Sequence, residues 1–304
     1  MAAEYNLLEN VDENENTRLK IKFEHWGEFL NFAINRTERI NYDNYYHQQA
    51  QSRATGREAE KFAETKTFEE AVKLATEGWQ EGLDKAKNFT ASLYNRLSQV
   101  IEKPEVLFDV TGNDYDIALV NQGVPECWMY TETHEEEGSG GKKFIHIVFN
   151  VSASGGVSSG VLINRGAAVA ALVDLFEAAG RAVILDIVDT SGFHKQKKRY
   201  IYEAHIRVKN ADQPLDLGRV IFGMAHPSML RRLMFSVQEG IKEVMPFTPG
   251  YGSVEEIEEH EQGDIYLAGA MWGQSQWDTP ESAKAWILKQ LTEQGVPISE
   301  GAAV

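Results

Sequence analysis

Three short polar side chains follow the most apolar strand that the sequence predicts, at residues 144–151. They are Asn150, Ser152 and Ser154, spaced two apart and followed by two glycines. In an open α/β sheet, ligands bind beyond the carboxyl ends of the parallel strands, which is where this loop is expected. Oxygen ligands of this kind suit Mg²⁺ or Mn²⁺. The loop therefore predicts either a divalent-metal site or a tight turn whose Ser and Asn side chains cap backbone amides.

Positive charge gathers at two places in the chain. Residues 194–199 read His-Lys-Gln-Lys-Lys-Arg, and a pair of arginines follows His226-Pro227 at the start of a helix. These positions predict contacts with an anion or with nucleic acid, because phosphate contacts are local. The alternatives are a solvated hairpin tip for the first group and a structural helix cap for the second. The candidate contact residues are Lys195, Lys197, Lys198, Arg199, Arg231 and Arg232.

A third group of polar residues shares one face of the strand predicted at 200–208. Strand alternation places Glu203, His205 and Arg207 on that face, with His146 on an adjacent element. Histidines and a carboxylate on neighbouring strands resemble the metal cluster of rolling-circle nicking enzymes, but the following helix contains no tyrosine to act as the nucleophile. The face predicts either a nucleic-acid-processing surface or the charged face of an edge strand.

The elements that position these groups alternate between strand and helix after residue 104. Strands are predicted at 106–110, 126–130, 144–151, 182–188, 200–208 and 264–270. Helices are predicted before Gly180, over 214–237 with a break at Pro227, and from Thr279 to Gly295. The strand, helix and strand between 144 and 188 form a βαβ unit, which requires a parallel pair and a right-handed crossover. The pattern predicts a three-layer, Rossmann-like α/β domain.

The first hundred residues carry helical patterns instead. Apolar residues between Leu19 and Ile40 recur every three or four positions, and a second helix begins at the Thr67 capping box and runs to Ile101. The sequence thus predicts an α-helical N-terminal region at 1–103 and an α/β domain at 104–304.

The series of elements from Phe144 to Val208 resembles the von Willebrand factor A domain. That family has the metal motif Asp-x-Ser-x-Ser at the end of its first strand, followed by a helix, a second strand and an antiparallel edge strand. The resemblance implies a Rossmann-like fold and a metal-bridged partner site, with a Thr and an Asp ligand from later loops, for which Asp189, Thr190 and Asp264 are candidates. Asn150 stands where the family has aspartate, so a metal would bind more weakly here.

A second resemblance covers more of the chain. It rests on Ser152-Ala153-Ser154 and on the segments at 163–168, 175–180 and 226–232, which look like a family carried by bacteriophages and plasmids. The resemblance implies a phage or plasmid setting and supplies no mechanism.

Composition narrows the class of protein. The 304 residues include 46 acidic and 30 basic side chains, a net charge of −16 that disfavours broad coating of nucleic acid. The single cysteine, Cys127, cannot form an internal disulfide, which favours a reducing, cytoplasmic setting, and it is expected in the core. The sequence offers no basic, apolar leader and no predicted membrane span.

No complete catalytic set emerges, so the sequence favours a protein-binding or assembly module over an enzyme. We expect a protein partner, contact through the helical N-terminal region, and Mg²⁺ or Mn²⁺ at the Asn150-x-Ser152-x-Ser154 loop. An oligomer and a place in a virion are further expectations. The competing hypothesis is a nucleic-acid-binding or -processing protein that uses the 194–199 turn and the face bearing His146, Glu203 and His205.

Overall fold

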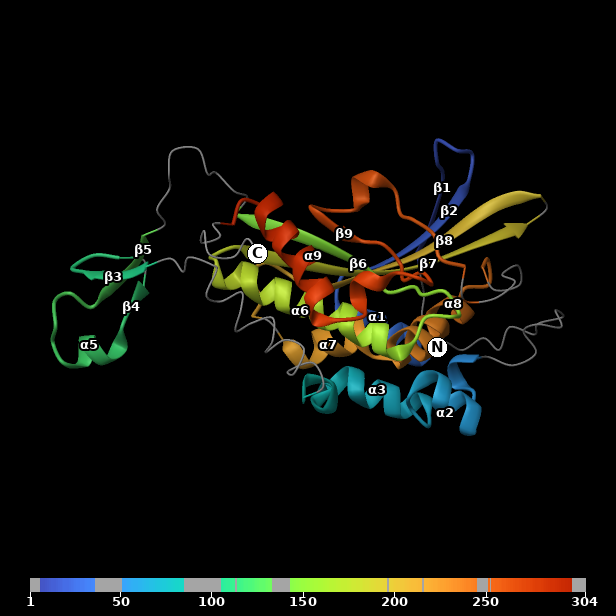
Figure 1. Ribbon diagram of the computed structural model, residues 1–304, viewed down its shortest axis with the longest axis horizontal. Helices are drawn as coiled ribbons and strands as arrows, with labels where there is room; N and C mark the ends of the chain where they lie inside the picture. Colours follow the sequence, from blue (N-terminus) through green and yellow to red (C-terminus); the bar gives the residue numbers. More distant parts are fainter. Residues whose placement is uncertain are drawn as a thin grey trace.

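The computed structural model is built around one six-stranded sheet with the order β1-β2-β8-β7-β6-β9 (Figure 1). Its strands are β1 (Leu7–Val11), β2 (Thr17–Phe23), β6 (Phe144–Asn150), β7 (Ala182–Lys195), β8 (Lys198–Lys209) and β9 (Ile265–Leu267). Strands β6, β7 and β9 are parallel, β8 is antiparallel to β7, and β2 is parallel to β8. The structure describes residues 6–35, 51–84, 105–112, 114–132, 143–195, 197–214, 216–244, 251 and 253–296.

The predicted βαβ unit is confirmed as β6, α6 (Ser159–Ala178) and β7. Helix α6 begins at Ser158, whose side chain accepts a hydrogen bond from the amide of Val161, and the chain turns after it at Gly180, with φ of +74°. By length and composition α6 could cross a membrane, contrary to the sequence expectation. However, 67% of its apolar window is buried inside the fold, as the central helix of a core requires.

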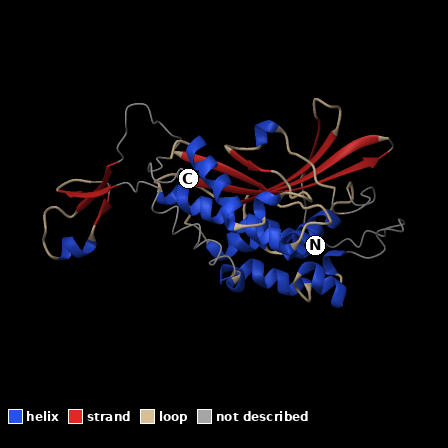
Figure 2. Ribbon diagram, viewed as in Figure 1, coloured by secondary structure: helices blue, strands red, loops and turns tan. Residues whose placement is uncertain are grey.

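Helices pack in layers below one face of the sheet (Figure 2). Helix α6 packs against α7 (Leu217–Ala225), where a Cβ atom at Gly166 would lie only 2.5 Å from that of Ala225. The helix predicted at 214–237 is broken at Pro227 as expected, and it continues as a π-helix (Met229–Met234) and α8 (Phe235–Gly240). Other helices among the described residues are α1 (Trp26–Asn35), η2 (Gln51–Arg53), α2 (Arg57–Ala63), α3 (Phe68–Glu77), η5 (Glu259–Glu261), η6 (Ser275–Trp277) and α9 (Pro280–Glu293).

The N-terminal region is not the helical unit that the sequence predicted. Residues 7–23 form β1 and β2, and β2 pairs with β8 within the main sheet. The boundary between 1–103 and 104–304 therefore divides one sheet, and β8 is an interior strand where an edge strand was expected. Helix α3 begins at Thr67 as predicted but ends at Gly78, with φ of +86°, and residues 85–104 lie outside the described part of the chain.

The expected three-layer sandwich is also wrong for the part of the chain that the structure describes. The second face of the sheet is crossed by an irregular segment, residues 253–264, that contains η5 (Glu259–Glu261); we call it the strap. The physical reason is that this face carries Arg18, Lys20 and Lys22 on β2 and Glu203, His205 and Arg207 on β8, so a helix would find little apolar surface to cover there.

A second, smaller sheet has the order β3-β5-β4. It comprises β3 (Glu105–Asp109), β4 (Asp114–Tyr115) and β5 (Trp128–Glu132), with the short helix α5 (Ile117–Asn121). The strands predicted at 106–110 and 126–130 are thereby confirmed within two residues. Cys127 is half-buried, which differs from the fully buried position expected.

Candidate functional site

The structure brings together three of the four predicted metal ligands, Asn150, Ser152 and Asp189, where β6 ends beside the middle of β7. The amide oxygen of Asn150 accepts a hydrogen bond from the backbone N–H of Ser152 at 3.0 Å. Its amide nitrogen donates to the carbonyl oxygen of Glu255 at 3.1 Å and to the hydroxyl of Tyr266 at 3.2 Å. The nitrogen of the Asn150 amide group therefore joins β6 to the strap and to β9, while its oxygen holds the loop that follows β6.

Asp189 lies at the bottom of this network and is 3% exposed. The Ser152 hydroxyl donates to its carboxylate at 2.9 Å and accepts from the amide of Thr190 at 2.7 Å. Burial raises the pKa of Asp189 to about 7. The neighbouring Tyr202 is fully buried, and its hydroxyl has no hydrogen-bond partner within the described residues. An ionisable carboxyl thus lies inside the sheet with one side-chain donor.

These residues do not fit a bound Mg²⁺ or Mn²⁺, because Ser154 lies apart and Asn150 turns its oxygen to a backbone amide, so that only two of the four, Ser152 and Asp189, bring side-chain oxygens together. The Asn150 oxygen caps an amide, the Ser152 hydroxyl contacts Asp189, and the strap closes over both. Ser154 stands apart from the network, since its backbone bonds to Ala270 and the residue lines a cavity beyond the sheet. The geometry matches the alternative interpretation, a tight turn with capping side chains.

The loop after β6 separates two cavities on the carboxyl edge of the sheet. One has a volume of about 260 Å³ and is lined by Ala153, Ser154 and Gly155 from the loop and by aromatic side chains on the far side. The other, of about 300 Å³, lies between the start of α6 and the loop after β9. The aromatic residues of the first cavity are Phe62, Phe235 and Tyr251.

Two tryptophans of the C-terminal region have opposite environments. Trp277 is buried and packs edge-on against Trp286, with 5.3 Å between ring centroids. Trp272 is 82% exposed, beside the half-exposed Met271, and both line the second cavity. The Trp272 ring lies so close to Gly156 that a Cβ atom there would approach it to 3.3 Å. An exposed tryptophan therefore lies against the predicted loop.

The prediction of an anion contact is wrong for the buried Arg232, and Arg231, which lines the first cavity, also has structural partners. Arg232 is 1% exposed and donates to the carbonyl oxygens of Ala54 at 2.7 Å and Thr65 at 2.8 Å. Arg231 donates to the carbonyl oxygen of Phe62 at 2.7 Å, and its guanidinium lies 4.4 Å from the centre of that ring. Both side chains attach the N-terminal segment to the core. Their position between Met-Leu and Leu-Met was the signal for burial in the sequence.

The basic turn at 194–199 forms the tip of the β7–β8 hairpin, as expected. Lys197, which has a φ of +68°, and Lys198 are exposed, while the side chain of Lys195 lies outside the described residues. Arg199 pairs with Glu255 of the strap at 2.6 Å. Part of the positive charge at this turn is therefore neutralised within the molecule.

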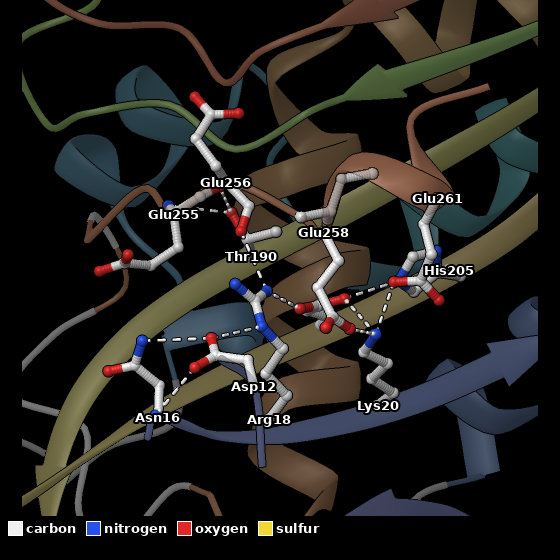
Figure 3. A network of polar contacts seen from close by, with 12 residues as sticks. Asp12, Asn16, Arg18, Lys20, Thr190, His205, Glu255, Glu256, Glu258 and Glu261 are labelled. Atoms are coloured by element: carbon white, nitrogen blue, oxygen red, sulfur yellow. Dashed lines mark hydrogen bonds and ion pairs between the residues drawn. The ribbon is translucent and has the colours of Figure 1, made fainter. Parts of the chain in front are cut away.

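The second face of the sheet carries a dense network of charges (Figure 3). Glu203 is 0% exposed and contacts Arg18 on β2 and the Nε2 atom of His205, the latter at 3.0 Å. Lys20 reaches from β2 to Glu258 and Glu261 of the strap, with 2.5 Å to a carboxylate oxygen of each. Alternation along β8 correctly placed Glu203 and His205 on one face of the strand. The residues that pair with this face lie on β2 and on the strap, and no sequence pattern predicted that these segments are its neighbours.

Beside this network, an open cavity of about 280 Å³ brings His146 and His205 to one surface, as the nucleic-acid hypothesis required. The Nε2 atom of His146 lies 2.7 Å from Asp186, which also pairs with Arg207. Burial acts to raise the pKa of Asp186, but hydrogen bonds from His146 and Arg207 hold it below its usual value. The buried Glu203 is not among the residues that line this cavity.

The chain matches a known protein family. A family model described as a domain of unknown function, DUF7192, matches residues 9–298. The chain belongs to this family. The matched region starts within β1 and extends beyond α9, so the family's domain includes both sheets and the N-terminal hairpin. Comparisons with curated proteins and with solved structures find no match.

Proposed function

We propose that this protein is a binding module and that another protein docks on the carboxyl edge of its main sheet, around Trp272. The observation that carries the proposal is the 82% exposure of that tryptophan, next to Met271 and against the loop that follows β6. Tryptophan is enriched among the residues that dominate the free energy of protein association. Large exposed apolar side chains that gather on one surface mark interaction sites.

The two cavities beside the loop support a macromolecular partner over a small ligand. Each has a volume of about 300 Å³ or less, which is at the lower limit for a site that encloses a drug-sized molecule. A protein surface could instead place one apolar side chain against Phe62, Phe235 and Tyr251 while Trp272 packs on the partner. The proposed partner therefore presents an apolar side chain within a flat surface.

The likeness to the von Willebrand factor A domain supports a partner site at the same edge of the sheet. The spatial order β8-β7-β6-β9, with β8 antiparallel to β7, agrees with the series of elements on which that resemblance rests. The proposal includes no bridging metal, because Asn150 and Ser152 use their oxygens within the protein. An intracellular, phage- or plasmid-associated setting stays part of the proposal on the ground of sequence resemblance alone.

Photo-crosslinking tests the proposal. Benzoylphenylalanine is incorporated at position 272 of the full chain in cells of the source organism, and at position 144 as a control. Phe144 is also exposed, at 59%, but it begins β6 and so lies at the opposite end of that strand. We expect a discrete protein adduct from position 272 and none from position 144.

The captured protein is then purified and its affinity is measured by calorimetry. Loss of a tryptophan at the centre of an interface costs on the order of 2–4 kcal/mol, so Trp272→Ala should weaken binding by roughly 30- to 1,000-fold, while Phe144→Ala should bind like the wild type. Equal affinities of Trp272→Ala and the wild type, or no adduct at position 272, would refute the proposal.

A further inference from the structure

We propose that Glu203, His205 and Glu261 bind a divalent transition-metal ion, Zn²⁺, on the second face of the sheet. One ligand atom from each side chain lies within 4.8 Å of the others. Zinc bonds of 2.0–2.2 Å in a tetrahedral site place the ligand atoms about 3.4 Å apart. Small side-chain rotations would bring the three ligand atoms from their present spacing to that of a zinc site, so that they fill three of the four coordination positions. This site is separate from the loop after β6 and does not rest on the proposed function.

The strands hold two of the ligands rigidly. Glu203 and His205 are two residues apart on β8, an interior strand, so their side chains project from the same face. The Nε2 atom of His205 already lies 3.0 Å from Glu203. Glu261 comes from η5 in the strap, which crosses this face and brings the third ligand to the pair (Figure 3).

The charge of the cluster favours a cation. Four carboxylates meet here with three bases, Arg18, Lys20 and Lys22, and with the His205 ring, which contacts Glu203. The third base, Lys22, is half-exposed and lies 3.4 Å from Glu261. With His205 neutral, as a metal ligand must be, three bases leave one of the four negative charges uncompensated, and a bound metal ion would supply the missing positive charge. The four carboxylates belong to Asp12, Glu203, Glu258 and Glu261.

Lys20 is the group that a metal would have to compete with. Its ammonium nitrogen lies 2.5 Å from Glu261 and 3.8 Å from Glu203, so it neutralises two of the proposed ligands. It also has a second partner, Glu258, at 2.5 Å. Entry of a metal would leave Lys20 bound to Glu258, and the strap would remain attached to β2.

An open cavity reaches two of the three proposed ligands, His205 and Glu261, while Glu203 is fully buried and does not line it. Its volume of about 280 Å³ leaves space for water on the ion. A second possible set, Glu258, His260 and Glu261, shares Glu261 but lies entirely on the strap. We favour the set with Glu203 and His205 because two of its members are fixed by an interior strand.

Calorimetric titration of the metal-free full chain with ZnCl₂ tests the site, and absorption of bound Co²⁺ reports its coordination. We expect one Zn²⁺ per chain. His205→Gln should weaken binding at least tenfold, while the matched variant His260→Gln should bind like the wild type. Lys20→Met should strengthen binding at least tenfold, because it removes the competing cation from the ligands.

Three results would overturn the proposal. The first is no Zn²⁺ binding by either the wild type or Lys20→Met at 100-fold excess of metal over protein. The second is loss of binding in His260→Gln with binding retained in His205→Gln, which would move the site to the strap. The third is weaker binding in Lys20→Met than in the wild type, given circular dichroism that shows both are folded. Lys20→Met keeps the test decisive if His205→Gln does not fold.

Discussion

Replacing Asp189 with asparagine should stabilise the protein at neutral and alkaline pH. The folded state raises the pKa of this carboxyl from 3.8 to about 7, so between these values it binds more protons than the unfolded chain. Stability contributed by this group therefore falls as the pH rises through that window. At about 1.36 kcal/mol per pH unit, the ionised Asp189 costs the folded state about 4 kcal/mol above pH 7. Asp189→Asn keeps an oxygen that can accept from Ser152 and removes this cost.

Urea unfolding from pH 5 to pH 8.5 measures the effect. The free energy of unfolding of Asp189→Asn minus that of the wild type should grow with pH and level off above pH 7. Asp186→Asn, three residues earlier on β7, is the matched control, and its change in the free energy of unfolding should have the opposite sign. Its carboxylate is stabilised by His146 and Arg207, so this variant should lose stability at neutral pH. A difference for Asp189→Asn that does not change with pH, or that falls as the pH rises, would refute the reasoning.

Three further changes test other contacts. Arg232→Ala should lower the free energy of unfolding by more than about 3 kcal/mol, because several buried carbonyl oxygens lose their hydrogen-bond donor. Limited proteolysis of this variant should cut first between residues 51 and 66, the segment that Arg232 holds. Gly166→Leu should cost at least 1–3 kcal/mol in thermal unfolding, since its Cβ atom would meet Ala225, whereas Gly155→Leu has open space and should cost little from overpacking. Addition of Mg²⁺ or Mn²⁺ should leave the melting temperature unchanged in the wild type and in Ser152→Ala; a rise confined to the wild type would restore the predicted metal loop.

Local signals in the sequence were sufficient where an element is stabilised by its own residues or its immediate neighbours. The capping residue Thr279 and the glycine after α6 gave helix ends that the structure confirms. The apolar run at 144–151 predicted a central strand, and β6 is largely buried between two parallel neighbours. The break at Pro227 followed from the missing N–H of proline and is observed.

Strand β2 was missed because its residues fit two patterns. Ile21 and Phe23 match the helical spacing that continues into α1, yet Arg18, Lys20 and Lys22 alternate with apolar residues as in a strand. The choice between them depends on β8, whose partner residues are more than 180 positions away. Tertiary pairing of this kind outweighs local propensity.

The candidate site was also predicted only in part, because some of its contacts depend on segments far apart in the sequence. Asn150, Ser152 and Asp189 were expected near the ends of two predicted parallel strands, and they do meet, although β7 continues past Asp189 to Lys195. Their hydrogen-bond partners depend on the strap, and no pattern in the sequence placed Glu255 over Thr190 or Glu261 beside His205. The exposure of Trp272 likewise depends on how the loop after β9 lies on Gly156.

The pairing of β2 with β8 constrains the order in which the chain can fold during synthesis. Thr17 to Phe23 leave the ribosome long before Tyr200 to Ile206, the residues that pair with them. At 5–20 residues per second, β2 waits for about 10–40 s without its parallel neighbour. During that time only the hairpin with β1 can satisfy one of its edges. An apolar and charged strand is thus exposed to other nascent chains until the C-terminal half of the sheet is made.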